Sequence, residues 1–481
     1  MRRRSTLPGY SITLILILIS VAAFARAQTT EARVAVVSLS PPRVKVEGTR
    51  SAPAKAWSFR ESYAGITGLG ERMENLTLAD ERGTVVAVRK LAPGEYESER
   101  EAVKFSYELK LDPPSAANDA AHVSWLTPTQ GALMPGDLMP LPLARARLSF
   151  KLPDGWKIAA PVKADAAGIF AFEDAESTVV FAGEGVRERG TSVRGMKLRV
   201  AVAGDWAFTD QEAEETIAAI IKEHAKTFGA MPRAAPLVVI APFPGQASAA
   251  QWAAETRGAT IFYLSGRAPS KISALARLSA PLAHESFHLW VPNGLGLVGD
   301  YAWFYEGFTN YEALRASQRL GYLSFDDYLS ALARAEDAYE LSRQQDTVSL
   351  LEASARRWSG SDALIYNKGM LVAALYDLSL RRSTGGKRML EDVYRLLFRR
   401  AQETAHGRDA NATVLGVLDE VAGAGSFSAR FIKGVEKIDL GAEFAPYGLR
   451  VERVGAHSRI VIATSLSGSQ RDLLRQIGYN H

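Results

Sequence analysis

Short runs of alternating apolar and polar residues dominate the first part of the chain. Examples are the segments VKFSYELKL, ARARLSFKL, STVVFAGEGV and MKLRVAVAG, and Pro, Gly, Asn and Asp separate such runs from one another. A period of two with turn residues between the runs is typical of β-strands. The pattern therefore predicts an N-terminal all-β, sandwich-like domain over residues 28–204.

The apolar period changes to that of a helix after residue 204. The first such run, TDQEAEETIAAIIKEHAKTFGAMP, has Thr209 as a polar cap, an acidic first turn and a Gly/Pro stop. Two strands are predicted at PLVVIAPF and ATIFYLSG, and helices dominate from about residue 271 to 435. We therefore expect an α+β protein whose second domain, residues 205–440, is mostly helical. In a tail over residues 441–481, the pattern predicts two strands and a short helix, which we expect to dock onto this domain.

The first 27 residues form a separate pattern. Arg2, Arg3 and Arg4 precede an apolar run over residues 12–24, and Ala25-Arg26-Ala27 offers a small-x-small cleavage site. This predicts a signal peptide over residues 1–27, and an exported protein in the periplasm or secreted. No later run approaches 18 apolar residues, so we expect no membrane span after cleavage.

Charge and cysteine content narrow the function classes. The segment 1–27 holds four arginines and no acid, so the net charge of +4 falls to about zero without it. No basic surface for nucleic acid is then expected, and a chain without cysteine forms no disulfide.

The stretch PLAHESFHLW carries candidate zinc chemistry. His284 and His288 are four residues apart in a helical pattern, so they share one face of a helix. Two imidazoles so placed can bind Zn²⁺, and Glu285 between them can act as general base on a bound water. The alternative is two unrelated histidines on an apolar helix. With seven histidines in the chain, a chance H-E-x-x-H is on the order of a one per cent event.

The next predicted helix, which begins near Asp300, offers two candidates for a third zinc ligand, Glu306 and Glu312. Glu306 lies within the aromatic run WFYEGF, which would bury its carboxylate, and a buried carboxylate needs a partner such as zinc. Glu312 lies six residues later, about 240° further round the helix, so the two cannot share a face. We expect Glu306 to be the ligand, and Glu312 to be solvated or to support a ligand.

The motifs resemble those of a known family. H-E-x-x-H-x-W followed by W-F-x-E-G-F-T-x-Y is similar to the glycyl aminopeptidase family of gluzincin zinc metallopeptidases. The resemblance implies a thermolysin-like catalytic domain with Glu306 as third ligand. The segment IYNKGMLV resembles the family's Y-x-K-G segment, whose tyrosine stabilises the tetrahedral intermediate, and implies this role for Tyr366. Without the family, Tyr366 would be an aromatic residue at a helix start.

Two departures from the family pattern stand out. The family's Gly-Gly-Leu-Glu-His-like strand has its nearest match in AAETRGAT, where Glu255 keeps only the glutamate. Glu255 could bind a substrate's α-amine, and the alternative is a surface carboxylate. Residues 441–481 are too short for the PDZ domain of many family members, so we expect that domain to be absent or a remnant.

The sequence thus predicts an exported zinc metallopeptidase that hydrolyses peptide or protein substrates. Aminopeptidase action is favoured over endopeptidase action by the resemblance alone. One alternative is a catalytically weak or inactive peptide-binding protein on the same fold, and another is a structural zinc site. The remaining histidines are expected at the surface or in packing, at residues His122, His224, His406, His457 and His481.

Overall fold

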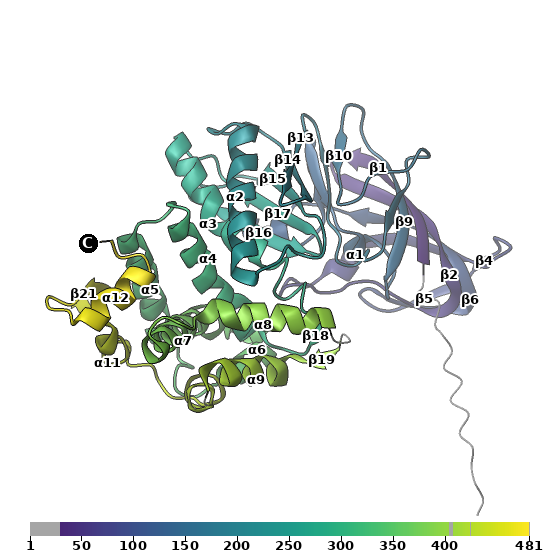
Figure 1. Ribbon diagram of the computed structural model, residues 1–481. Helices are drawn as coiled ribbons and strands as arrows, with labels where there is room; N and C mark the ends of the chain where they lie inside the picture. Colours follow the sequence, from purple (N-terminus) through teal and green to yellow (C-terminus); the bar gives the residue numbers. More distant parts are fainter. Residues whose placement is uncertain (1–28, 404–406, 424, 481) are drawn as a thin grey trace, which may run out of the picture.

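The computed structural model describes residues 29–403, 407–423 and 425–480. The predicted signal peptide lies outside the described residues. A sheet-rich N-terminal part lies beside a helical part, and the C-terminal tail lies at the far end of the helical part (Figure 1). The predicted α+β fold class, with strands first and helices after them, is confirmed. In the described part of the chain, no helix has both the length and the apolar character needed to cross a bilayer.

The N-terminal part contains two sheets. The larger sheet has the strand order β11-β9-β1-β2-β6-β3-β4, with β5 also paired to β6, and the smaller has the order β10-β12-β8-β7. Alternating side chains from the two sheets meet in a common apolar core, which is why these segments read with a period of two. The strands are β1 (Thr29–Leu39), β2 (Pro42–Ser58), β3 (Met73–Ala79), β4 (Val85–Val86), β5 (Val88–Ala92), β6 (Glu95–Lys110), β7 (Trp125–Leu126), β8 (Gln130–Leu133), β9 (Arg145–Lys151), β10 (Lys157–Ala159), β11 (Phe170–Phe172) and β12 (Val180–Gly183).

A third sheet joins the N-terminal part to the helices. Its order is β13-β14-β15-β17-β16, from strands β13 (Arg187–Val193), β14 (Met196–Val202), β15 (Leu237–Pro242), β16 (Trp252–Arg257) and β17 (Thr260–Ser265). One face packs against the smaller N-terminal sheet and the other against helices, so the central strands read as continuous apolar runs. Since β14 pairs with β15, this sheet extends across the predicted boundary at residues 204–205. The division of the chain into domains stays a prediction.

Two helices cover the helical face of this sheet. Thr209 caps the N-terminus of helix α2 (Asp210–Phe228), as predicted, and forms a capping box with Glu212. Helix α3 (Lys271–Phe287) carries the zinc motif at its C-terminal end and runs through Pro281. The other helices of three or more turns are α4 (Thr309–Arg319), α5 (Phe325–Glu340), α7 (Gly369–Thr384), α8 (Leu390–Glu403) and α9 (Ala410–Ala422).

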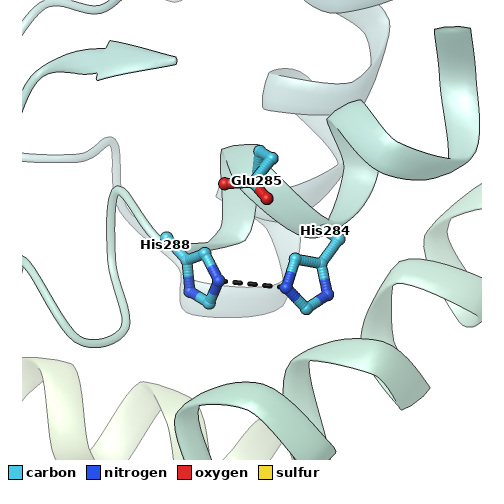
Figure 2. Close-up of side chains that lie close together, drawn as sticks. All are labelled: His284, Glu285 and His288. Carbon is cyan, nitrogen blue, oxygen red and sulfur yellow. Dashed lines mark hydrogen bonds between the residues drawn. The ribbon is translucent and has the colours of Figure 1, made fainter. Parts of the chain in front are cut away.

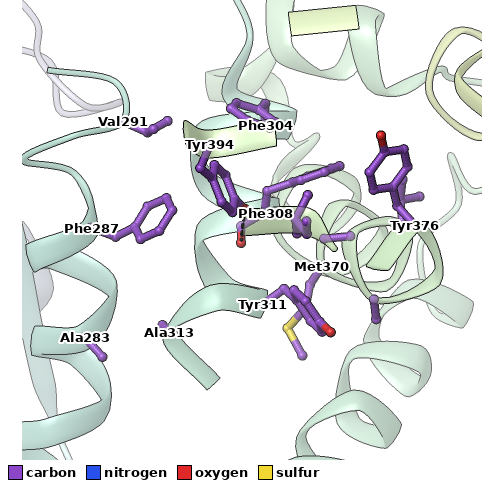
Figure 3. Close-up of a cluster of buried hydrophobic side chains, with 14 of the residues drawn as sticks. Ala283, Phe287, Val291, Phe304, Phe308, Tyr311, Ala313, Met370, Tyr376 and Tyr394 are labelled. Carbon is purple, nitrogen blue, oxygen red and sulfur yellow. Dashed lines mark hydrogen bonds between the residues drawn. The ribbon is translucent and has the colours of Figure 1, made fainter. Parts of the chain in front are cut away.

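Aromatic side chains fill the core between α3, α4 and α8. Phe287 of α3 lies 5.0 Å from Tyr394 of α8 by ring centroids, and Phe304 and Phe308 pack beside them (Figure 3). These residues are almost fully buried. The packing fixes the end of α3 against the segment that carries Glu306.

The C-terminal tail lies against the helical part. It contains the hairpin β20 (Leu449–Val454) and β21 (His457–Ile462), followed by α12 (Gly468–Gln476). The backbone N–H of Ser458 donates to Asp337 of α5 at 2.8 Å. The tail therefore shares contacts with the body that holds the site.

Candidate active site

His284 lies in the last turn of α3 and His288 is the residue that caps its C-terminal end, and their rings turn toward one another (Figure 2). Their Nε2 atoms are 3.1 Å apart (Figure 2). Oε2 of Glu306 lies 3.1 Å from Nε2 of His284 and 3.6 Å from Nε2 of His288. The three side chains therefore gather two nitrogens and one oxygen around a single point.

The spacing of this trio fits a tetrahedral zinc ion. With bonds of about 2.0 to 2.2 Å, two ligand atoms of a tetrahedron lie roughly 3.3 to 3.6 Å apart. The observed separations of 3.1 to 3.6 Å overlap this range. Nδ1 of His288 can donate to the carbonyl of Val291 at 2.9 Å, which leaves its Nε2 lone pair for a metal. Two imidazoles and one carboxylate form a donor set that zinc uses with one position open.

Paired charges compensate for the burial of these ligands. Burial alone would raise the pKa of the Glu306 carboxyl, but the two histidines and Arg357 hold it well below its usual range. Burial would lower the pKa of His288, but Glu306 raises it to about 9. A metal cation can take the place of the proton in such a cluster.

Glu285 lies beside the trio and accepts a hydrogen bond from the edge strand β16. One of its oxygens lies within 4.8 Å of ring nitrogens of both histidines. The hydroxyl of Thr256 lies 2.7 Å from Oε2 of Glu285 and 2.8 Å from its backbone carbonyl. Thr256 therefore orients the proposed base. Sequence reasoning missed Thr256, although it directly follows Glu255 in the segment compared with the family.

Glu312 lies in a separate buried network. It is 1% exposed, and Oε2 lies 3.4 Å from Nη2 of Arg319. Burial and the nearby Glu391 raise the pKa of the Glu312 carboxyl. The expectation of a solvated Glu312 is wrong, because this face of α4 turns into the helical core, where the carboxyl lies against Arg319 and not in water.

We expect Glu306→Gln to lose zinc and Glu312→Gln to keep it. The loss should exceed the roughly 10- to 100-fold weakening typical of residues that only support a ligand. Since the pKa of Glu312 is raised, an amide is a close substitute there. Metal analysis after dialysis, with chelator competition, measures both proteins. Zinc retained by Glu306→Gln and lost by Glu312→Gln would show that the assignment is wrong.

Two π-helical segments bring together the carboxylate of Glu306, the proposed third ligand, and the phenol of Tyr366. These are Trp303–Phe308 and Leu364–Lys368, each at the start of a longer helix. A Cβ on Gly307 would lie 2.6 Å from Cα of Gly369, so the two backbones touch at glycines. This close approach gives a physical reason for the E-G and K-G pairs in the two motifs.

Tyr366 borders the cavity of the trio and is not packed into the core on the far side of its helix. Nη2 of Arg357 lies 2.7 Å from the Tyr366 hydroxyl oxygen and 2.7 Å from Oε1 of Glu306. Burial and Glu306 raise the pKa of the phenol, while Arg357 lowers it, so the phenol stays protonated at neutral pH and can donate. Sequence reasoning missed Arg357, which begins a single 3-10 turn, Arg357–Ser359, with no motif around it.

Glu255 also lines this cavity and is not a surface carboxylate, since 15% of its side chain is exposed. Tyr63, from the N-terminal part, donates its hydroxyl to Oε1, and Nδ1 of His122 lies 3.0 Å from Oε2. Nε of Arg257 lies 3.4 Å from Oε1. Tyr63, His122 and Arg257 therefore already contact the Glu255 carboxylate.

His122 is part-exposed, with 29% of its side chain accessible, and also borders the cavity through its contact with Glu255. Sequence reasoning missed this contact because Glu255 lies more than a hundred residues later, in β16. His224 is buried in packing beneath α3, as expected, with Nε2 2.7 Å from the carbonyl of Ala283. His457 is exposed. His406 and His481 lie outside the described residues.

Two cavities meet at the zinc motif. The first, of about 720 Å³, is lined by polar residues that include Tyr63, Glu255, His288, Glu306 and Arg357. The second, of about 740 Å³, has a more apolar lining that includes Trp252, Pro281, Leu314, Ala335 and Met370. His284, Glu285 and Tyr366 border both. The two cavities therefore share a wall at the zinc motif.

The comparison with family models covers the segment that follows the histidines. Residues 297–372 match the model of the M61 glycyl aminopeptidase family. The resemblance to this family is confirmed. The matched range contains both π-helical segments, and the match supports the prediction that the chain is a metallopeptidase. A search of the curated proteins finds no match.

Solved structures share the fold. An aminopeptidase N family protein from Idiomarina loihiensis superposes with a TM-score of 0.76 at 16% identity, covering 88% of this chain and 79% of that chain. An M1 zinc metallopeptidase from Deinococcus radiodurans superposes with a TM-score of 0.54 at 13% identity, covering 86% and 94%. A variant of that enzyme bound to a Tyr-Ser-Ala substrate gives 0.54 at 14% identity, covering 84% and 93%. At these identities the likeness shows the fold.

Proposed function

We propose that this chain is an exported zinc aminopeptidase. The observation that carries the proposal is the gathering of His284, His288 and Glu306 at zinc-ligand spacing, with Glu285 and Tyr366 on the same cavity. A structural zinc site would close its coordination with four protein ligands, whereas this trio leaves a position open. Export is supported by the arginine cluster, apolar run and cleavage site in residues 1–27.

The proposed reaction assigns proton transfer to one side chain and stabilisation of the developing negative charge to another. Zinc held by the trio would supply Lewis-acid activation of a water molecule and of the scissile carbonyl. Glu285, oriented by Thr256, takes a proton from the attacking water and later passes it to the leaving amine. Tyr366 donates its O–H to the oxygen of the scissile carbonyl, on which negative charge develops.

Aminopeptidase action is supported by Glu255 on the cavity wall. Its carboxylate could bind a substrate's α-ammonium group, and burial of the pair would strengthen the attraction. A second candidate is cleavage within a chain. That reading is favoured by the donors already on Glu255 and by the second cavity, which adjoins the first at the zinc motif.

A peptide library tests the function and separates the two modes. The protein without residues 1–27 is incubated with mixed peptides and with their N-acetylated counterparts, with and without a zinc chelator. We expect release of N-terminal residues from free peptides only, loss of cleavage with chelator, and recovery when zinc is added. Internal cleavage of free and acetylated peptides alike would assign an endopeptidase. Zinc-loaded protein that binds peptides without cleaving them would contradict the proposal and favour a peptide-binding protein.

A further inference from the structure

Arg357 lies on the cavity wall between the third zinc ligand and the candidate phenol. It follows the short helix α6 (Leu350–Ala355), and 17% of its side chain is exposed. Its guanidinium lies over the ring of Trp358, 4.6 Å from the centroid, and Nη1 donates to the hydroxyl of Tyr305 at 2.9 Å. These contacts hold the guanidinium plane in place.

The Glu306 carboxylate is divided between Arg357 and the histidines. Oε1 lies 2.7 Å from Nη2 of Arg357, while Oε2 lies 3.1 Å from Nε2 of His284. This close ion pair attracts Oε1 to the guanidinium and so disfavours rotation of the carboxylate about its last bond. Oε2 is therefore kept directed at the point that the two histidines share.

The same nitrogen also fixes the phenol of Tyr366. Nη2 also donates a hydrogen bond to the Tyr366 hydroxyl oxygen at 2.7 Å. Because that oxygen accepts a hydrogen bond from Arg357, the hydroxyl's own hydrogen is left to donate elsewhere. Since Tyr366 borders the cavity, a substrate oxygen bound there can accept that hydrogen.

We propose that Arg357 is a positioning residue that couples the third zinc ligand to the oxyanion donor. This inference rests on the proposed function, since it assigns Arg357 to the same reaction. A lysine offers a single ammonium on a flexible stem, so it keeps the charge but not the planar fork that reaches Glu306, Tyr366 and Tyr305 together. The coupling therefore depends on the geometry of the guanidinium as well as on its charge.

The first test measures zinc affinity in the absence of substrate. Arg357→Gln and Arg357→Lys are compared with Arg356→Gln, a control at the exposed neighbouring arginine. Chelator competition should show zinc affinity lowered roughly 10- to 100-fold in Arg357→Gln and unchanged in the control. Circular dichroism establishes that each variant is folded, and Arg357→Lys provides a folded protein if Arg357→Gln is not.

Catalysis at saturating zinc gives the second test. We expect kcat of Arg357→Gln to fall on the order of 10²-fold with little change in KM, as small misplacements of reacting groups can cost that much. In a Tyr366→Phe background the same substitution should change kcat only a few-fold, because Arg357 acts through that phenol. Arg357→Lys should recover only part of either loss.

Two outcomes would overturn the inference. In the first, Arg357→Gln leaves zinc affinity unchanged and lowers kcat by the same factor in the parent and in the Tyr366→Phe background. In the second, Arg357→Lys has the zinc affinity and kcat of the parent. The proposed function is judged separately, on hydrolysis by the parent protein and its loss in Glu285→Gln. A parent that hydrolyses peptides, with Arg357→Gln behaving like Arg356→Gln, would refute only the role of Arg357.

Discussion

Glu285→Gln should keep zinc and the fold but lose almost all peptide hydrolysis. The amide preserves the shape of the side chain and keeps an oxygen that can accept from Thr256. It cannot take a proton from water, and general base catalysis is typically worth about 10² to 10⁴ in rate. Zinc should stay because the closest ligand atoms belong to His284, His288 and Glu306.

Steady-state kinetics and metal analysis on the same preparations check this result. Glu285→Asp serves as a companion, because it keeps a carboxylate but withdraws it by one methylene, and it should lose less activity than the amide. Glu312→Gln controls for removing a buried glutamate elsewhere in the helical part. Activity of Glu285→Gln within a few-fold of the parent would remove Glu285 from the mechanism.

Features that depend on local spacing could be predicted from the sequence. The change from a period of two to a helical period gave the order of the elements. The four-residue spacing of His284 and His288 gave two rings on one face of α3, as the structure has them. Burial of Glu306 followed from the aromatic residues around it. Each of these inferences needed only residues close together in the chain.

The environment of Glu312 could not be predicted in this way. A helical wheel says that Glu312 and Glu306 face different directions, but it does not say what covers each face. The polar neighbours suggested water, whereas the fold places the carboxylate beside Arg319 and Glu391 in the core. Tertiary packing therefore overrode the local pattern.

Residues that reach the cavity from distant segments were also missed. Tyr63 comes from the N-terminal part, and its hydroxyl contacts Glu255, almost two hundred residues later in the sequence. His122 and Arg357 likewise have no motif of their own. Their roles appear only when three parts of the chain meet around one cavity.

Tyr366→Phe should lower kcat about 10² to 10³-fold while leaving KM largely unchanged. The hydroxyl is proposed to act on charge that exists only in the transition state, so ground-state binding should not depend on it. A loss of this size corresponds to about 3 to 4 kcal/mol, which is typical for removing one donor to an oxyanion. The ring itself, which borders both cavities, is retained.

The structure makes the expected result specific to the hydroxyl. Phe at this position leaves Arg357 with its contacts to Glu306 and Tyr305, so zinc affinity should change less than in Arg357→Gln. Tyr305→Phe is the matched control, since it removes another hydroxyl bonded to the same guanidinium. If Tyr366 supplies the oxyanion donor, Tyr305→Phe should cost much less in kcat than Tyr366→Phe. Equal losses from the two variants, or an unchanged kcat in Tyr366→Phe, would mean that Tyr366 only helps to hold Arg357 in place.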